Sequence, residues 1–205
     1  THDMKPYRLS EEEKFKVSKA TCMAVNELHE MPTSLAHRDL RPENVLLMPS
    51  GMIALTDFGL ARRAPKKWKG SSVYDNNRLT TMQPYEVQIK FAEEGPNVRQ
   101  EFCVTHSGDV FMLGLVVAYI NLGFRPYEHD DEIKNRKEPN LGNLRATNPW
   151  LHHLLSSMLS HQIDERPTME YVLRHPYFLS PTQNFDQYLI GRVETTIVCD
   201  YRPVD

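Results

Sequence analysis

Apolar positions recur at helical spacing near the start of the chain. Ser10 followed by Glu13 has the form of a capping box, the pairing that often begins a helix. Small and apolar residues then repeat every three or four positions, at Val17, Ala20, Thr21, Ala24, Val25 and Leu28. The pattern predicts one long helix over residues 11–30, which Pro32 ends.

Three later segments also predict helices. Residues 110–120 are apolar on every side and contain Gly114, which indicates a helix buried all round. That run is too short to span a bilayer. Residues 150–159 are amphipathic, and residues 168–173 form a short helical stretch that Thr168 can cap. The fold is therefore expected to be mainly α-helical.

One segment between the first two helices predicts β-structure. Residues 44–48 and 52–56 read as strands, and Pro-Ser-Gly at 49–51 reads as the turn between them. A small β-hairpin of this length would return the chain to its starting end. Asn44 and Asp57 are thus expected to lie side by side, although they are distant in sequence.

Composition narrows the class of protein. The chain has 205 residues, 40% of them apolar, which suits one domain or one large lobe with a tail. The net charge of −3 does not favour nucleic acid as a partner, and no membrane segment is predicted. Cys22, Cys103 and Cys199 are few and far apart, which favours a reducing, intracellular and cytoplasmic location.

Two short motifs carry candidate chemistry. Residues 37–44 read HRDLRPEN, and residues 57–59 read DFG. Asp39, Asn44 and Asp57 supply the oxygen groups that phosphoryl transfer needs, one to orient the attacking hydroxyl and two to hold magnesium. The alternative is that the two aspartates merely cap turns. That alternative leaves the order of the later motifs unexplained.

Together these motifs resemble the eukaryotic protein kinase family, of the serine/threonine rather than the tyrosine type. The resemblance runs from about Leu9 to about Phe178 and covers the family's C-terminal lobe. Later landmarks follow in the family's order, at residues 84–86 (PYE), 107–114 (SGDVFMLG), 123–127 (GFRPY), 165–168 (ERPT) and 175–178 (HPYF).

The resemblance implies a domain organisation. Residues 1–178 would form a protein-kinase-like C-terminal lobe, with catalytic loop, activation segment and helical bundle, and residues 179–205 a tail of unknown role. The family's Gly-rich loop and strand lysine do not appear. We therefore expect the N-terminal lobe to be absent, and the piece to be inactive by itself.

The resemblance also assigns catalytic roles. Asp39 would be the catalytic base, which orients the substrate hydroxyl, and Arg41 would place positive charge beside the transferred phosphate. Asn44 and Asp57 would bind Mg²⁺ and, through it, ATP. The implied cofactors are ATP and Mg²⁺. The implied partners are a protein with a serine or threonine hydroxyl and the missing N-terminal lobe.

Regulation and substrate reading are implied for further residues. Arg38 would bind a phosphate on the activation segment, with candidate acceptors at Ser71, Ser72, Tyr74, Thr80 and Thr81. Glu43 resembles a glutamate that reads basic peptide side chains in some kinases, or it is a solvated loop charge. The basic run at 62–69 is either a solvated face or a site for a phosphorylated loop or an acidic substrate.

Structural roles are implied for His37, Phe58, Gly59, Glu86, Asp109 and Arg166. His37 would hold the catalytic loop, Phe58 would pack against the missing lobe, and Gly59 would permit a sharp turn. Asp109 would accept hydrogen bonds from the loop backbone. Glu86 and Arg166 would form a buried ion pair, whose disruption typically costs about 3–5 kcal/mol.

The sequence leaves three functions open. The first is ATP- and Mg²⁺-dependent phosphoryl transfer to protein serine or threonine hydroxyls. The second is a pseudokinase scaffold or allosteric switch, because residues 79–86 depart from the family's activation-segment pattern. The third is the kinase-like part of a kinase–ribonuclease, suggested by residues 175–180 with Phe185 and Val193.

Overall fold

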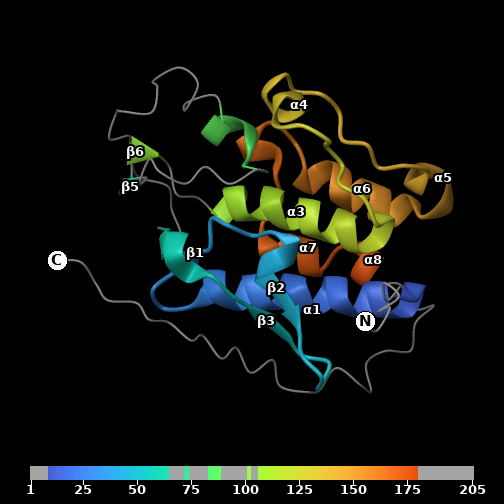
Figure 1. Cartoon of the computed structure of the whole chain (residues 1–205), viewed down its shortest axis with the longest axis horizontal. Coiled ribbons are helices and arrows are strands. Elements are labelled where there is room, and N and C mark those ends of the chain that lie inside the picture. Colours follow the sequence, from blue (N-terminus) through green and yellow to red (C-terminus); the bar gives the residue numbers. More distant parts are fainter. Residues whose placement is uncertain (1–8, 65–71, 74–82, 89–100, 103–105, 180–205) are drawn as a thin grey trace, which may run out of the picture.

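The computed structural model describes residues 9–64, 72–73, 83–88, 101–102 and 106–179. Within these ranges the fold is helix-rich with a few short strands (Figure 1). The α-helices are α1 (Glu11–Glu30), α3 (His106–Leu122), α4 (Asp130–Lys134), α5 (Leu144–Thr147), α6 (Pro149–Met158), α7 (Met169–Leu173) and α8 (Pro176–Leu179), and residues 85–88 are also helical. The strands are β1 (Leu35–Ala36), β2 (Val45–Leu47), β3 (Ile53–Leu55), β4 (Arg62–Arg63), β5 (Ser72–Val73) and β6 (Glu101–Phe102).

Helix α1 has the predicted bounds and the predicted cap. The Ser10 hydroxyl accepts a hydrogen bond from the Glu13 amide at 3.3 Å, and the Glu13 carboxylate accepts one from the Ser10 amide at 2.8 Å. At the other end, the amide of Met31 donates to the carbonyl of Glu27 at 3.0 Å, which closes the last turn before Pro32. The apolar face of α1 packs against α3 and α7.

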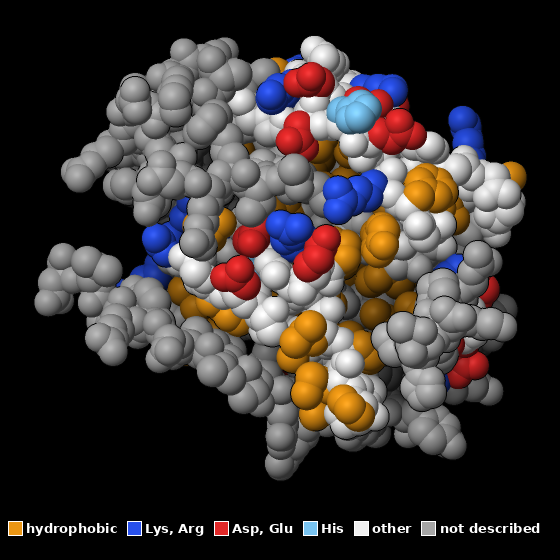
Figure 2. Space-filling view, viewed as in Figure 1, with side chains coloured by type: hydrophobic (Ala, Val, Ile, Leu, Met, Phe, Trp, Pro, Cys, Tyr) orange, Lys and Arg blue, Asp and Glu red, His pale blue; other side chains and the backbone are white. Residues whose placement is uncertain are grey.

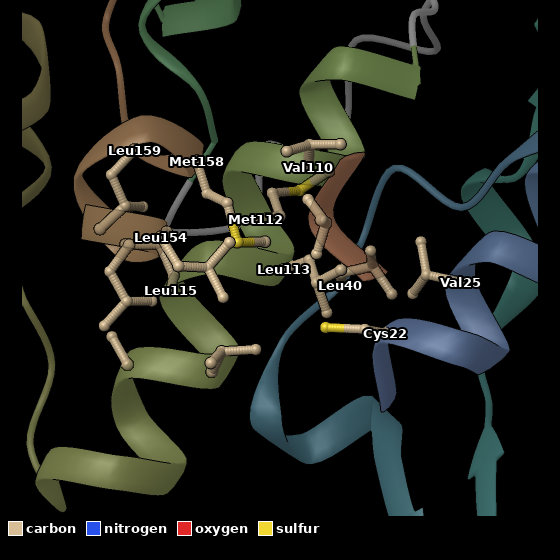
Figure 3. Close-up of a cluster of buried hydrophobic side chains, with 14 of the residues drawn as sticks. Cys22, Val25, Leu40, Val110, Met112, Leu113, Leu115, Leu154, Met158 and Leu159 are labelled. Atoms are coloured by element: carbon tan, nitrogen blue, oxygen red, sulfur yellow. The ribbon is translucent and has the colours of Figure 1, made fainter. Parts of the chain in front are cut away.

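Helix α3 is the centre of the core. Its residues 109–118 are all buried, between α1 on one side and α6 on the other (Figure 3). The two helices α3 and α6 approach closely at Gly114. A Cβ there would lie 3.0 Å from side-chain atoms of Met158 and Leu159, so a larger residue at this position would require these side chains to shift. The apolar run therefore forms a buried helix, as its pattern predicts.

The predicted hairpin is present in front of these helices. Strands β2 and β3 are antiparallel, with Val45 opposite Leu55 and Leu47 opposite Ile53. Gly51 takes a φ of +82° in the turn, a conformation that glycine adopts without a steric penalty. Exposed apolar side chains lie along β2 and its turn (Figure 2), at Leu46, Leu47 and Met48.

Two further strand pairs and two short helices complete the described chain. Strand β1 pairs with β4 and β5 with β6, both antiparallel. Helices α4 and α5 lie in a segment for which the apolar pattern predicts no helix. Each is too short to leave a clear apolar repeat in the sequence, which explains the difference. No helix among the described residues is both long and apolar enough to cross a membrane.

Candidate active site

The segment between β1 and β2 holds Asp39 and Asn44 against each other. The side-chain amide of Asn44 donates to the backbone carbonyl of Asp39 at 2.8 Å and to its carboxylate Oδ2 at 3.1 Å. Both residues are buried. Because a carbonyl can only accept, the NH₂ group of Asn44 must face Asp39, and its Oδ1 atom is left for another partner.

The hairpin brings Asp57 to the same end of the structure. The amide of Thr56 donates to the carbonyl of Asn44 at 3.0 Å, which joins the two ends of the hairpin. Asp57 is exposed and has a φ of +58°, in the left-handed region. Its Oδ1 atom accepts a hydrogen bond from the Gly59 amide at 3.4 Å, and its other oxygen stays available.

Arg41 lies close enough to Asp39 and Asp57 to interact electrostatically with both. A hydrogen bond to Glu43 is the largest factor that raises the pKa of Arg41, and the negative charges of Asp39 and Asp57 raise it further. One guanidinium is thus influenced by carboxylates from two motifs, which supports their placement around a common site.

Asp109 fixes the backbone of this segment to helix α3. Its carboxylate accepts hydrogen bonds from the amides of His37 at 2.7 Å and Arg38 at 2.8 Å, and contacts Nε2 of His29 at 2.9 Å. Burial by itself would raise the pKa of Asp109. The hydrogen bond with His29, the electrostatic attraction of His29 and His37, and the bond from the Arg38 amide outweigh it and hold the pKa below its ordinary value.

His37 links the two motifs. Its Nε2–H group donates to the carbonyl of Thr56 at 3.0 Å, and its Nδ1 atom accepts from the amide of Asp39 at 3.3 Å. The ring of Phe58 lies 4.8 Å from the ring of His37. With both ring nitrogens in use, His37 has the contacts of a residue that supports the loop. Phe58 is half-buried against the core.

Arg166 and Glu86 form the expected ion pair. Two nitrogens of Arg166 each donate to one carboxylate oxygen of Glu86 at 2.7 Å. The Arg166 side chain is fully buried, whereas Glu86 is a quarter exposed. Arg166 also donates to the carbonyls of Ser107 and Ser160, so the pair joins residues 85–88 to the start of α3 and to the segment after α6.

The activation-segment predictions fall mostly outside the described residues. That holds for Ser71, Tyr74, Thr80 and Thr81, and Ser72 is described only by its backbone, which pairs with Phe102. Arg38 has a φ of +69°, and its carbonyl accepts from the Gln83 side chain at 3.3 Å. Of the basic run, the lysines lie outside the described residues, and the two arginines form β4.

Sequence reasoning missed two contacts of this region. No contact was predicted for His29, yet it contacts Asp109 in the buried interior. Arg125 was given no role, yet its Nη2 atom lies 3.6 Å from Oε1 of Glu43. The Leu-His pair at 28–29 could have pointed to His29. Nothing in the sequence around Arg125 indicated its partner.

Comparison with known proteins finds similar sequences over most of the chain. A family model described as "Protein kinase domain" matches residues 2–178. The serine/threonine-protein kinase PEPKR2 of Arabidopsis thaliana is 31% identical over 179 residues, which cover 84% of this chain and 34% of that protein. The serine/threonine-protein kinase/endoribonuclease IRE1 of Oryza sativa subsp. japonica is 28% identical over 175 residues, 81% of this chain and 18% of that protein.

A solved structure shows the same fold. "Titin kinase and its flanking domains" matches with a TM-score of 0.67 and 20% sequence identity, over 87% of this chain and 31% of that chain. The chain therefore spans about a third or less of the length of these similar proteins. At this identity the structural match speaks for the fold alone.

Proposed function

Since this chain belongs to the protein kinase family, we propose that it takes part in transferring the γ-phosphoryl group of ATP to a serine or threonine hydroxyl of a protein. The observation that carries the proposal is the shared site of Asp39, Asn44 and Asp57. Asn44 donates to Asp39, and the Thr56–Asn44 hydrogen bond brings Asp57 to the same end of the hairpin.

The free oxygen atoms of this site suit Mg²⁺. The hydrogen bonds of Asn44 leave its amide oxygen available, and one carboxylate oxygen of Asp57 accepts no hydrogen bond within the described residues. Mg²⁺ prefers such oxygen ligands and is commonly shared between one or two side chains and substrate phosphates.

Each residue then has a chemical task. Asn44 and Asp57 would hold Mg²⁺, which when bound neutralises charge on the phosphates. Asp39 would orient the attacking hydroxyl and accept its proton on a carboxylate oxygen. The hydrogen bond from Asn44 fixes the rotamer of that carboxylate. Arg41 would attract the anionic phosphoryl group, since its charge lies near both aspartates.

The first prediction tests this assignment through Asp57. In the full-length protein with Mg²⁺ and labelled ATP, Asp57→Ala should reduce phosphate transfer to itself or to a peptide below detection. Removal of a magnesium ligand leaves the phosphates without a positioned counter-charge. Asp39→Asn should lower the rate by roughly 10²–10⁴-fold, the usual range for a general base.

The matched control is Asp131→Ala. Asp131 is an exposed aspartate that pairs with Lys134 on α4, outside the proposed site. This variant should transfer phosphate at the unaltered rate. Undiminished transfer by Asp57→Ala would refute the metal assignment. If the unaltered protein itself transfers no phosphate, a scaffold role without catalysis replaces the proposal.

A further inference from the structure

Glu43 lies between two arginines. Its Oε2 atom accepts a hydrogen bond from Nε of Arg41 at 3.0 Å, and its Oε1 atom lies 3.6 Å from Nη2 of Arg125. The hydrogen bond from Arg41 is the main reason that the pKa of Glu43 is lowered, and the charges of both arginines add to it. Each carboxylate oxygen of Glu43 therefore faces a guanidinium.

Arg125 reaches this place from a separate part of the chain. It follows α3, whereas Glu43 belongs to the short 3₁₀ turn at residues 42–44. Its side chain is 45% exposed and makes no other ion pair or hydrogen bond with the described residues. Because a guanidinium carries five N–H donors, Arg125 keeps donors free beside Glu43.

The charges of this cluster sum to a net positive. Two guanidiniums face one carboxylate, and two members of the cluster, Arg41 and Glu43, lie within five residues of Asp39 in the sequence. An arriving basic side chain would have to displace one arginine from Glu43 and would meet the other. An arriving anionic side chain would find the free donors of Arg125, which can bind both of its oxygens.

We propose that Arg125 is a specificity-determining residue that binds one anionic side chain of the protein substrate near the phosphate-accepting hydroxyl. The anion is a carboxylate or a phosphate, which share the same geometry toward a guanidinium. The proposal rests on the proposed function and names its substrate class. It differs from the expectation that Glu43 itself reads a basic residue, because Glu43 is already paired.

The residues around Arg125 limit the preference to a single anionic residue of the substrate. Arg125 borders a hollow of about 210 Å³ whose lining also includes Tyr127, Glu128, His129 and Asp130. Glu128 and Asp130 would repel an extended acidic stretch. One anionic residue at the edge that Arg125 forms is therefore the favoured substrate feature.

Peptide substrates test the proposal. A serine peptide would carry a single Asp, Ala or Lys at each position in turn on either side of the acceptor. The full-length protein would be assayed for kcat/KM and, without ATP, for binding by fluorescence anisotropy. At one position, the Asp peptide should have a kcat/KM and a binding affinity roughly fivefold above those of the Ala peptide, as for one solvent-screened charge contact. The Lys peptide should have lower values than the Ala peptide. Phosphoserine at that position then shows whether a carboxylate or a phosphate binds more tightly.

Variants then assign the preference to Arg125. Arg125→Glu should reverse the Asp-to-Lys ratio at that position, and Arg125→Gln should abolish it. The matched control is Arg174→Glu. Arg174 is another exposed arginine that pairs with a glutamate, since its Nη1 atom lies 3.0 Å from Oε1 of Glu170. This variant should keep the original Asp-to-Lys ratio. An unchanged ratio in Arg125→Glu overturns the proposal.

The two proposals fail in different ways. If no peptide is phosphorylated by the unaltered protein, the proposed function fails, while the anisotropy ratio still decides the role of Arg125. If phosphate is transferred but Asp and Lys peptides react equally, the proposed function stands and the role of Arg125 is refuted.

Discussion

At the scale of single residues, Asp109 connects the buried core to the candidate site. It is fully enclosed, yet its carboxylate stays charged because two backbone amides and His29 surround it. An isolated buried carboxylate would be costly, whereas one with several donors is tolerated. Its position at the start of α3 also places it where the helix dipole favours a negative charge.

The variant Asp109→Asn tests how much this carboxylate contributes to the stability of the fold. Loss of the charge should reduce the free energy of unfolding by about 3 kcal/mol at neutral pH, as when one member of a buried pair is removed. Because the pKa of Asp109 is lowered on folding, its contribution is present above the ordinary carboxyl pKa of about 3.9 and is lost as the pH falls through the lower folded value.

Urea unfolding at a series of pH values measures this effect. The difference in stability between the unaltered protein and Asp109→Asn should be constant near neutrality and should shrink at acidic pH. A difference that persists unchanged at the acid end would mean that the charge of Asp109 does not stabilise the fold.

The sequence could predict much of the site at this scale, but not all of it. Asp39, Asn44 and Asp57 stand in short motifs with fixed spacing, and the hairpin between them is readable from turn chemistry. The contact between Arg125 and Glu43 depends on the path of the chain after α3. An exposed arginine can pair with any nearby acid, so no local pattern predicts which one it contacts.

At the scale of elements, the helices α1, α6 and α7 begin where a side chain accepts a hydrogen bond from a free amide of the first turn. Asn148 caps α6 by accepting from the amide of Leu151, and Thr168 caps α7 by accepting from Tyr171. Helix α1 has the more complete arrangement, since Ser10 and Glu13 each bond the other's backbone. Such caps are worth typically about 1 kcal/mol because the first amides of a helix lack internal partners.

Ser10→Ala tests the cap of α1. The free energy of unfolding should fall by about 1 kcal/mol, because the Glu13 amide loses its acceptor. Thermal or urea unfolding would measure the loss. Ser50→Ala, in the exposed turn of the hairpin, should change stability by less than about 0.5 kcal/mol. Equal effects of the two substitutions would argue against the capping contribution.

Long helices and the hairpin were predictable, and the strands of two residues were not. The bounds of α1 agree with the prediction, and α6 starts one residue earlier, because an apolar repeat over several turns identifies a helix. Strands β1 and β4 have two residues each and pair across a separation of many residues. Two residues cannot show an alternating pattern, so such strands follow from the tertiary fold and not from local sequence.

At the scale of the whole molecule, the ion pair of Glu86 and Arg166 connects segments far apart in the chain. Its geometry is bidentate, and Arg166 is fully buried. The guanidinium also lies over the ring of Phe111, with Cζ 4.9 Å from the ring centre. The pair thus links the helical residues 85–88, the core of α3 and the chain before α7.

Glu86→Ala should lower the free energy of unfolding by about 3 kcal/mol, because it leaves Arg166 buried without its counter-charge. A double-mutant cycle with Arg166→Met measures the coupling, which should be roughly 1–3 kcal/mol. The same cycle on the exposed pair Glu170–Arg174 should give no more than about 0.5 kcal/mol. Comparable coupling in the two pairs would contradict the structural role.

The helix-rich, protein-kinase-like part of the fold prediction is confirmed at this scale, and the expected absence of the N-terminal lobe stays a prediction. The family match and the helix-rich structure agree with the kinase-like fold that the motifs of residues 37–44 and 57–59 predict. Those motifs could be recognised because chemistry fixes both their residue types and their order. The positions of α4 and α5 could not, because neither helix is long enough to impose a pattern on the sequence.

The attachment of the 37–44 loop to α3 has one more consequence. The backbone amides of His37 and Arg38 in this loop donate to Asp109, which belongs to a helix whose residues 109–118 are buried. A substitution among these buried residues that shifts the helix slightly would therefore move the loop that carries Asp39, while the protein stays folded. Loss of catalytic activity and loss of solubility would then result from different substitutions among the buried residues of the same helix.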